Sequence, residues 1–108
     1  MPRSNAAPRF QDLNQVIHER TRLAIMSYLI PAGEASFSEL KEELRLTDGN
    51  LNLHMRVLEK NGYVTVRKEF VRRRPRTTYQ TTARGRREFD GYVALLERIL
   101  EPSARRNG

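Results

Sequence analysis

The sequence has no cysteine among its 108 residues. Disulfide bonds, thiol redox switches and cysteine-ligated zinc are therefore excluded. It also lacks a run of eighteen apolar residues, which a membrane-spanning helix would need, and its first ten residues contain no apolar stretch typical of a secretory signal. These absences predict a soluble, cytoplasmic protein that does not associate with membranes.

Features typical of enzymes are also lacking. The sequence contains no glycine-rich phosphate loop, and its serines lack the context of a nucleophile elbow. The two histidines, His18 and His54, have no evident catalytic partners. The carboxylates of Glu39, Glu42 and Glu43 are explained more simply as the solvated face of a short helix. We therefore predict a protein that is not an enzyme and that holds no metal or other cofactor.

Positive charge is what the chain has in excess. Its net charge is +7 and its isoelectric point is about 10.5. Residues 67–87 contain nine basic residues and one acidic residue, a net charge of +8, so the rest of the chain is close to neutral. A localised basic region predicts an acidic partner, with nucleic acid as the first expectation and an anionic membrane surface as the second.

The length suits one domain. Residues 1–10 are expected to form a flexible arm and residues 102–108 a flexible tail, because both ends are polar. The folded domain is then expected to span residues 11–101.

Apolar periodicity predicts two helices in the first third of the chain. The first begins at Asp12, an N-capping residue, and the second spans residues 20–30 and is ended by Pro31 and Gly33. The apolar face of the first helix consists of Leu13, Val16 and Ile17. The second helix is apolar over a wide arc, as expected of a buried helix.

A pair of helices with helix-turn-helix spacing follows. One is expected over residues 38–45 with Ser38 as its N-cap, and the next over residues 48–60 after a three-residue break. The second helix has the clearer signals, because Thr47 can cap its start and Asn61-Gly62 can end it.

The outward face of the second helix has side chains that suit the major groove of DNA. Gly49 permits a close approach of the backbone. An adenine edge suits Asn50 or Asn52, and a guanine edge or a phosphate suits Arg56, while Leu53 can touch a thymine methyl group. A merely solvated face remains the alternative for a helix pair considered alone.

A change of period after Gly62 predicts a hairpin with strands over residues 63–71 and 76–81 and a basic turn between them. The arginines of the turn cannot pack into a core, but they can reach phosphates or the minor groove. The predicted DNA-binding residues of this wing, residues 68–76, are Lys68, Arg72, Arg73, Arg74 and Arg76. A basic turn is often only a solvated tip, but a helix-turn-helix followed directly by one favours DNA binding.

A last helix is expected to start after Thr82 and to run to about Leu100. Its apolar stripe and that of the first helix exceed what a three-helix core and a hairpin need. We expect these two apolar stripes to form the interface of a homodimer. The alternative is that they complete the core of the monomer. The predicted interface comprises Leu13, Val16, Ile17, Phe89, Tyr92, Leu95, Leu96 and Ile99.

Together these features resemble small single-domain winged-helix transcriptional regulators of the MarR/ArsR-like group. The resemblance is carried by residues 47–66, 22–26, 74–79 and 82–92, and it covers roughly residues 12–100. It implies an α+β, mainly helical fold: a winged helix-turn-helix with a two-stranded wing, flanked by N- and C-terminal dimerisation helices.

The resemblance also implies a homodimer that binds a near-palindromic site in double-stranded DNA by helix and wing, with repression as the expected outcome. The residues that match the DNA-facing part of the family are Thr47, Asp48, Gly49, Asn50, Asn52 and Arg56. Leu53 departs from the polar or basic residue more common in relatives, and Ala83 stands where proline commonly opens the last helix. Metal sensing is not expected, because that branch of the group uses cysteines and histidine pairs.

Two other functions remain open at this point. One is a winged-helix protein-interaction module, which the arginine-rich wing disfavours. The other is RNA binding or DNA binding without sequence preference, which sequence selectivity would distinguish. A small-molecule effector between the terminal helices is a further hypothesis, but no group of residues in the sequence identifies a site for it.

Overall fold

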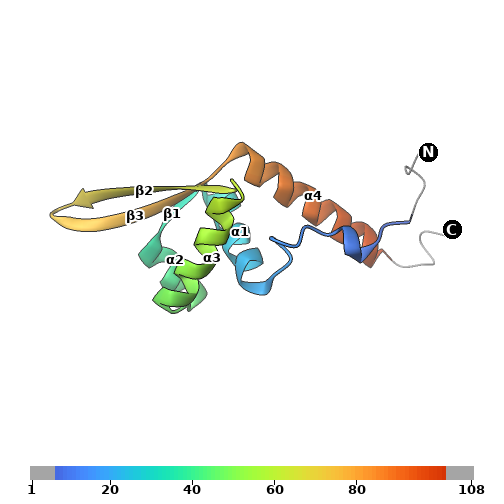
Figure 1. The fold of residues 1–108 in the computed structure, drawn as a ribbon, viewed down its shortest axis with the longest axis horizontal. Helices are drawn as coiled ribbons and strands as arrows, with labels where there is room; N and C mark the ends of the chain where they lie inside the picture. The colour runs from blue at the N-terminus through green and yellow to red at the C-terminus, as the bar shows by residue number, and fades with distance from the viewer. Residues whose placement is uncertain (1–6, 102–108) are drawn as a thin grey trace.

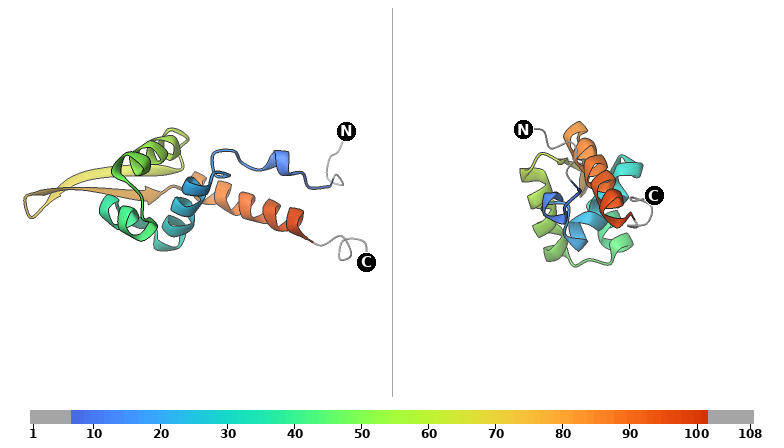
Figure 2. Two further views of the ribbon diagram at one scale, coloured as in Figure 1. Left: turned by 90° about the horizontal axis from the view of Figure 1, so that it is seen from below. Right: turned by 90° about the vertical axis from the view of Figure 1, so that its right-hand side faces the viewer.

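The computed structural model describes residues 7–101. The tail expected at 102–108, and most of the arm expected at 1–10, lie outside the described residues. A helical body occupies the middle of an elongated molecule of 61 × 28 × 21 Å (Figure 1). A hairpin projects from one end of the body, and a long helix projects from the other (Figure 2).

The order of elements confirms the expected winged-helix fold. The elements are a short 3-10 helix η1 (Phe10–Asp12), helix α1 (Arg20–Ala32), strand β1 (Glu34–Ser36), helix α2 (Phe37–Leu44), helix α3 (Asp48–Lys60), strands β2 (Val64–Val71) and β3 (Arg74–Thr81), and helix α4 (Ala83–Leu100). Helix α1 runs two residues beyond the predicted end, because Pro31 lies inside its last turn and the helix ends at Gly33.

The wing belongs to a three-stranded antiparallel sheet with strand order β1-β3-β2. Strands β2 and β3 pair along their whole length, up to Val71 opposite Arg74, so the turn consists of Arg72 and Arg73 alone. The predicted turn was two residues too long, since Arg74 and Pro75 belong to β3. The sequence does not reveal β1, because three residues are too few to show alternation.

Capping side chains decide where α2 and α3 begin. Helix α3 begins and ends where predicted, and the hydroxyl of Thr47 accepts a hydrogen bond from the backbone N–H of Asn50 at 3.1 Å. The prediction that Ser38 caps α2 was wrong. Ser36 does so, and its hydroxyl accepts from the backbone N–H of Glu39 at 3.0 Å. Ser36 ends strand β1 and has the extended backbone that an N-cap requires.

The helix predicted to begin at Asp12 is also wrong. Within residues 7–101, no α-helix precedes α1. The side-chain oxygen of Asn14 accepts from the backbone N–H groups of Val16 and Ile17, at 2.8 and 3.0 Å, and so caps a single turn. Glu19 then caps α1 only five residues later. Two caps so close together leave no length for a separate helix.

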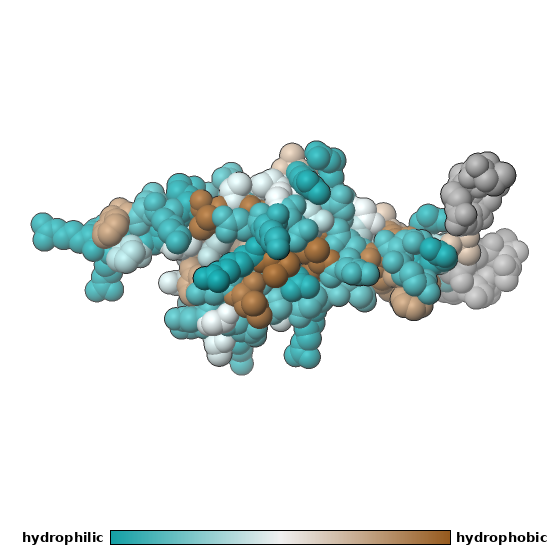
Figure 3. All heavy atoms as spheres, in the orientation of Figure 1, coloured by the Kyte–Doolittle hydropathy of each residue, from teal (hydrophilic) through white to brown (hydrophobic). Residues whose placement is uncertain are grey.

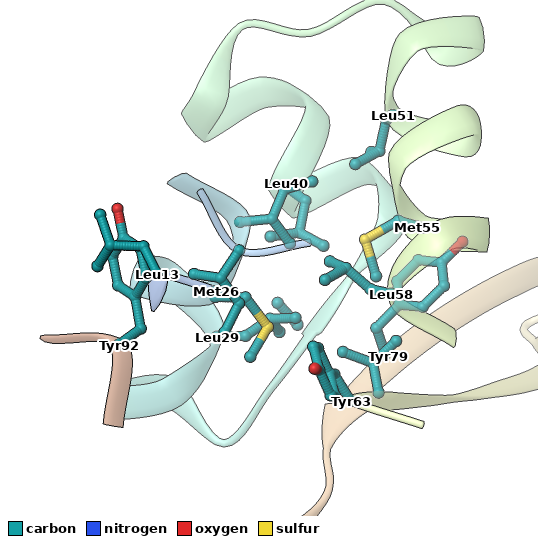
Figure 4. Packing of buried hydrophobic residues seen from close by; sticks show 14 residues of the cluster. Leu13, Met26, Leu29, Leu40, Leu51, Met55, Leu58, Tyr63, Tyr79 and Tyr92 are labelled. Atoms are coloured by element: carbon teal, nitrogen blue, oxygen red, sulfur yellow. The ribbon is translucent and has the colours of Figure 1, made fainter. Parts of the chain in front are cut away.

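The core lies between α1, α2, α3 and the inner half of the sheet (Figure 4). Three residues predicted to form the dimer interface, Leu13, Ile17 and Tyr92, are buried in this core with exposed fractions of 6%, 0% and 3%. Because the N-terminal segment folds back as a turn, its apolar side chains are covered by their own chain. The remaining predicted interface residues are only partly buried: Val16, Phe89, Leu95, Leu96 and Ile99.

Helix α4 is attached through a close backbone contact at its first turn. The Thr82 hydroxyl accepts from the backbone N–H of Gly85 at 2.9 Å and donates to the carbonyl of Gly62 at 2.6 Å. A Cβ atom placed on Gly85 would lie 2.3 Å from the carbonyl oxygen of Tyr63. Only glycine therefore allows α4 to meet the start of the wing in this way.

We expect Gly85→Ala to lower the free energy of unfolding by about 1–3 kcal/mol, because the backbone of Tyr63 must move to admit a methyl group. Gly91→Ala is the matched control in the same helix, since its added Cβ meets nothing within 4 Å. That variant should be more stable than the wild type by about 0.5–1 kcal/mol. Urea denaturation measures both changes, and equal effects of the two substitutions would contradict the close contact.

Candidate nucleic-acid interface

The predicted reading face of α3 is exposed to solvent. Its exposed residues, with the cap before the helix, are Thr47, Asp48, Gly49, Asn50, Asn52, Leu53 and Arg56. Leu53 is 59% exposed although it is apolar. A Cβ added at Gly49 would meet nothing within 4 Å, so the backbone of the first turn is open to an approaching ligand. The opposite side of the helix is buried in the core and holds α3 in place.

A groove of about 420 Å³ joins α3 to the wing. Asn52 and Arg56 line it from the helix, and Lys68 lines it from β2, so the structure brings these predicted residues together. Two carboxylates line it as well: Asp48, which was predicted to face DNA, and Glu59, for which the sequence predicted no role. Carboxylates repel phosphate but can accept a hydrogen bond from cytosine, so this groove suits base edges better than a sugar-phosphate backbone.

The charges of α3 and the wing are not all free. Asp48 forms an ion pair with Lys41 of α2, with 2.7 Å between Oδ1 and Nζ. Arg67 on β2 lies 3.7 Å from the Glu34 carboxylate and 3.6 Å from that of Glu69. The charge of Arg67 is therefore offset by two carboxylates of the protein itself. In this respect Arg67 differs from the predicted DNA-binding cations of the wing.

The turn of the wing has an unusual backbone. Arg72 and Arg73 have φ angles of 54° and 67°, and positive φ at both central residues is the signature of a type I′ turn. Asn-Gly is the preferred pair in such turns, and a left-handed conformation costs other residues about 1–2 kcal/mol each. Strain of this kind concentrates at functional sites, where side-chain chemistry overrides local propensity.

The wing carries basic side chains on both of its faces. Lys68 faces the α3 groove, whereas Arg74 and Arg76 line a second hollow of about 350 Å³ between the wing and the start of α2. All five predicted wing residues are exposed. The hairpin therefore presents cations on both sides and at its tip, an arrangement suited to phosphates that flank a groove.

A polar cluster behind the reading face holds α3 against α1. Nη1 of Arg22 lies 3.0 Å from Nδ1 of His54, and Oε1 of Glu19 lies 3.5 Å from the same nitrogen. Nε of Arg22 also donates to the carbonyl of Val16 at 2.6 Å. Because an arginine N–H always donates, Nδ1 of His54 accepts from Arg22 when the imidazole is neutral, whereas a protonated ring gives Glu19 a cationic neighbour. The sequence showed no evident partner for His54, because Arg22 and Glu19 precede it by 32 and 35 residues.

The environment of Glu19 lowers the pKa of its carboxyl group. Partial burial by itself raises the pKa, but the backbone N–H groups of Arg22 and Thr21, and the charges of His54 and Arg22, outweigh it. A group whose pKa is depressed on folding stabilises the fold above its unfolded-state pKa. That stabilisation is lost as the pH falls through the folded-state value.

We therefore expect the urea concentration at the unfolding midpoint of the wild type to decrease once the pH is lowered below about 4.3, the ordinary pKa of a glutamic acid. Protonation of Glu19 should account for part of this decrease. Glu19→Gln should weaken this dependence on acid. Glu42→Gln, at an exposed position of α2, serves as the control. If both variants lost stability in acid as steeply as the wild type, the cluster would not stabilise α3 through the charge of Glu19.

Residues 21–100 match the family model of a winged helix DNA-binding domain. The chain belongs to this family. Over 79 residues this winged-helix domain is 34% identical to an uncharacterized protein of Methanocaldococcus jannaschii, and the match covers 73% of this chain and 86% of that protein.

Solved structures show the same relationship. The winged-helix domain is similar to a transcriptional regulator homologue from Pyrococcus horikoshii OT3, with a TM-score of 0.75 and 38% identity over 79% of this chain and 84% of that one. It is also similar to a protein from Enterococcus faecalis V583 that is described as a MarR-family transcriptional regulator. There the TM-score is 0.66 and the identity 28%, over 76% of this chain and 74% of that one.

These comparisons confirm the MarR/ArsR-like resemblance. The similar structures with a described role are of transcriptional regulators and not of enzymes. Within residues 7–101, the winged-helix domain has no helix that is long and apolar enough to cross a membrane.

Proposed function

We propose that this winged-helix domain acts as a homodimeric transcriptional regulator, with α3 in the major groove of a specific duplex site and the wing on phosphates and the minor groove. Occlusion of a promoter by the dimer would make it a repressor. The observation that carries the proposal is the groove shared by Asn52, Arg56 and Lys68. It places an amide and a guanidinium, which can recognise base edges, beside a hairpin that carries most of the chain's excess positive charge.

The second copy is expected to bind at α4. This helix docks on the body through its first half, where Tyr92 lies 2.7 Å from Nδ1 of His18 and Glu88 accepts from Asn14 at 3.0 Å. Its last turns extend away from the wing, beyond the body (Figure 2). The apolar side chains that a partner helix could cover are Phe89, Val93, Leu95, Leu96, Ile99 and Leu100. A twofold dimer through α4 would place two α3 helices at half-sites about one helical turn apart.

Selection from a randomised duplex pool at near-physiological salt tests this function. We expect an inverted repeat to be enriched and two chains to sediment with each duplex. Asn52→Ala and Arg56→Ala lie on the exposed face and should each relax the preference at defined positions, by about 1–3 kcal/mol per base pair. Retention of the pool without enrichment would instead support non-specific binding, and no retention would support a protein-interaction module.

A double substitution at the wing tip separates DNA contact from folding. Arg72→Asn with Arg73→Gly provides the pair that a type I′ turn prefers, so the free energy of unfolding should rise by about 1–2 kcal/mol. Affinity for duplex DNA should nevertheless fall. The slope of log affinity against log salt should become shallower by about 0.9 for each lost phosphate contact.

Fluorescence anisotropy at several salt concentrations measures this slope. Arg67→Gln is the matched control on the same hairpin, because its guanidinium lies beside Glu34 and Glu69 and should add little to the slope. A tip variant that is more stable but has the salt slope of the wild type would exclude phosphate contacts at the turn.

A further inference from the structure

Phe70 is a large apolar side chain in a hairpin that carries many charged residues. It is 76% exposed, and its cross-strand partner Pro75 is exposed too. In Figure 3 a brown patch interrupts the hydrophilic surface near the end of the projecting hairpin. Full burial of a phenylalanine is worth about 1.5–3 kcal/mol, and nothing in the wing provides it. An aromatic ring held out at the end of a hairpin indicates a contact with a partner.

The register of the hairpin fixes the direction in which Phe70 faces. Alternate residues of a strand share one face of a sheet, so Phe70 lies on the same face as Val66 and Lys68. Those two residues line the groove that also holds Asn52 and Arg56. A ligand bound along this groove would therefore meet Phe70 at the outer end of the same surface.

The charges around Phe70 identify the chemistry of that ligand. Five exposed basic residues lie in the same part of the wing. Lys68 is on the face of Phe70, Arg72 and Arg73 form the turn beside it, and Arg74 and Arg76 are on the opposite face. An apolar protein surface would have to bury these cations, whereas a polyanion that also offers stacked apolar faces would satisfy both. Duplex DNA does so, because apolar side chains can enter between base pairs from the minor groove while arginines contact the phosphates.

We propose that Phe70 is a wedge that enters the minor groove beside the half-site read by α3 and partly unstacks one base step. This inference rests on the proposed DNA-binding function. Insertion from the minor groove kinks the duplex toward the major groove. The ring makes no hydrogen bond to a base, so it selects sequence through deformability and favours a flexible TA or CA step at that position.

The test uses the full chain and the duplex enriched by selection, or a random-sequence duplex if none is enriched. A 2-aminopurine, whose fluorescence rises on unstacking, is placed in turn at each step that flanks the half-site, or at each step of the random-sequence duplex. Wild-type protein should raise the fluorescence at one step. Phe70→Ala should abolish the rise and weaken binding about tenfold, without a change in salt slope because no charge is removed.

Two further variants control this experiment. Phe70→Leu keeps an apolar wedge and should retain part of the fluorescence rise. Arg73→Ala should weaken binding and reduce the salt slope but leave the rise in place.

Binding by Phe70→Ala with unchanged affinity and fluorescence would overturn the wedge and leave the proposed function intact. Failure of the wild type to bind any duplex would overturn both. The wedge would also be overturned if Phe70→Ala lost the affinity of the wild type for anionic vesicles but left the 2-aminopurine fluorescence rise in DNA unchanged. Phe70 would then contact lipid and not a base step.

Discussion

The point where the wing returns to the helical body depends on a backbone-to-backbone contact between the first turn of α4 and Tyr63. The carbonyl of Tyr63 accepts a hydrogen bond from the backbone N–H of Thr82 at 3.0 Å, and the Thr82 hydroxyl donates to the preceding carbonyl. Gly85 leaves room for both. This junction sets the direction in which α4 leaves the body and the position of the first residues of β2. The orientation of the wing relative to α4 follows from it.

A division of the molecule into two chemically different ends follows from this junction. The hairpin carries exposed arginines and one exposed aromatic ring, and it shares a groove with α3. The far half of α4 carries partly buried leucines and an isoleucine. A small core between α1, α2 and α3 supports both ends, so the domain separates a basic surface, which suits an acidic ligand, from an apolar surface, where we propose that a second copy binds.

Local signals were sufficient for the central elements. Helix α3 could be predicted to the residue because Thr47 caps it, its apolar residues recur on one face, and Asn61-Gly62 ends it. The wing could be predicted because period-two alternation begins directly afterwards. The same signals failed where two capping residues compete. Ser36 rather than Ser38 begins α2, and Asn14 rather than Asp12 caps the N-terminal turn.

The sequence by itself determined the helix-turn-helix, the basic hairpin and the exposed polar and basic residues of α3 and the wing, because each depends on neighbours within one or two turns of chain. Only the tertiary structure decided the fate of the N-terminal segment. Asn14 donates hydrogen bonds to Tyr63 and Glu88, which are 49 and 74 residues away. Its neighbours Leu13 and Ile17 are buried in the core. Hydrophobic periodicity predicts that a residue is buried, but it does not predict which surface covers that residue. The sequence therefore could not distinguish a partner chain from the protein's own core.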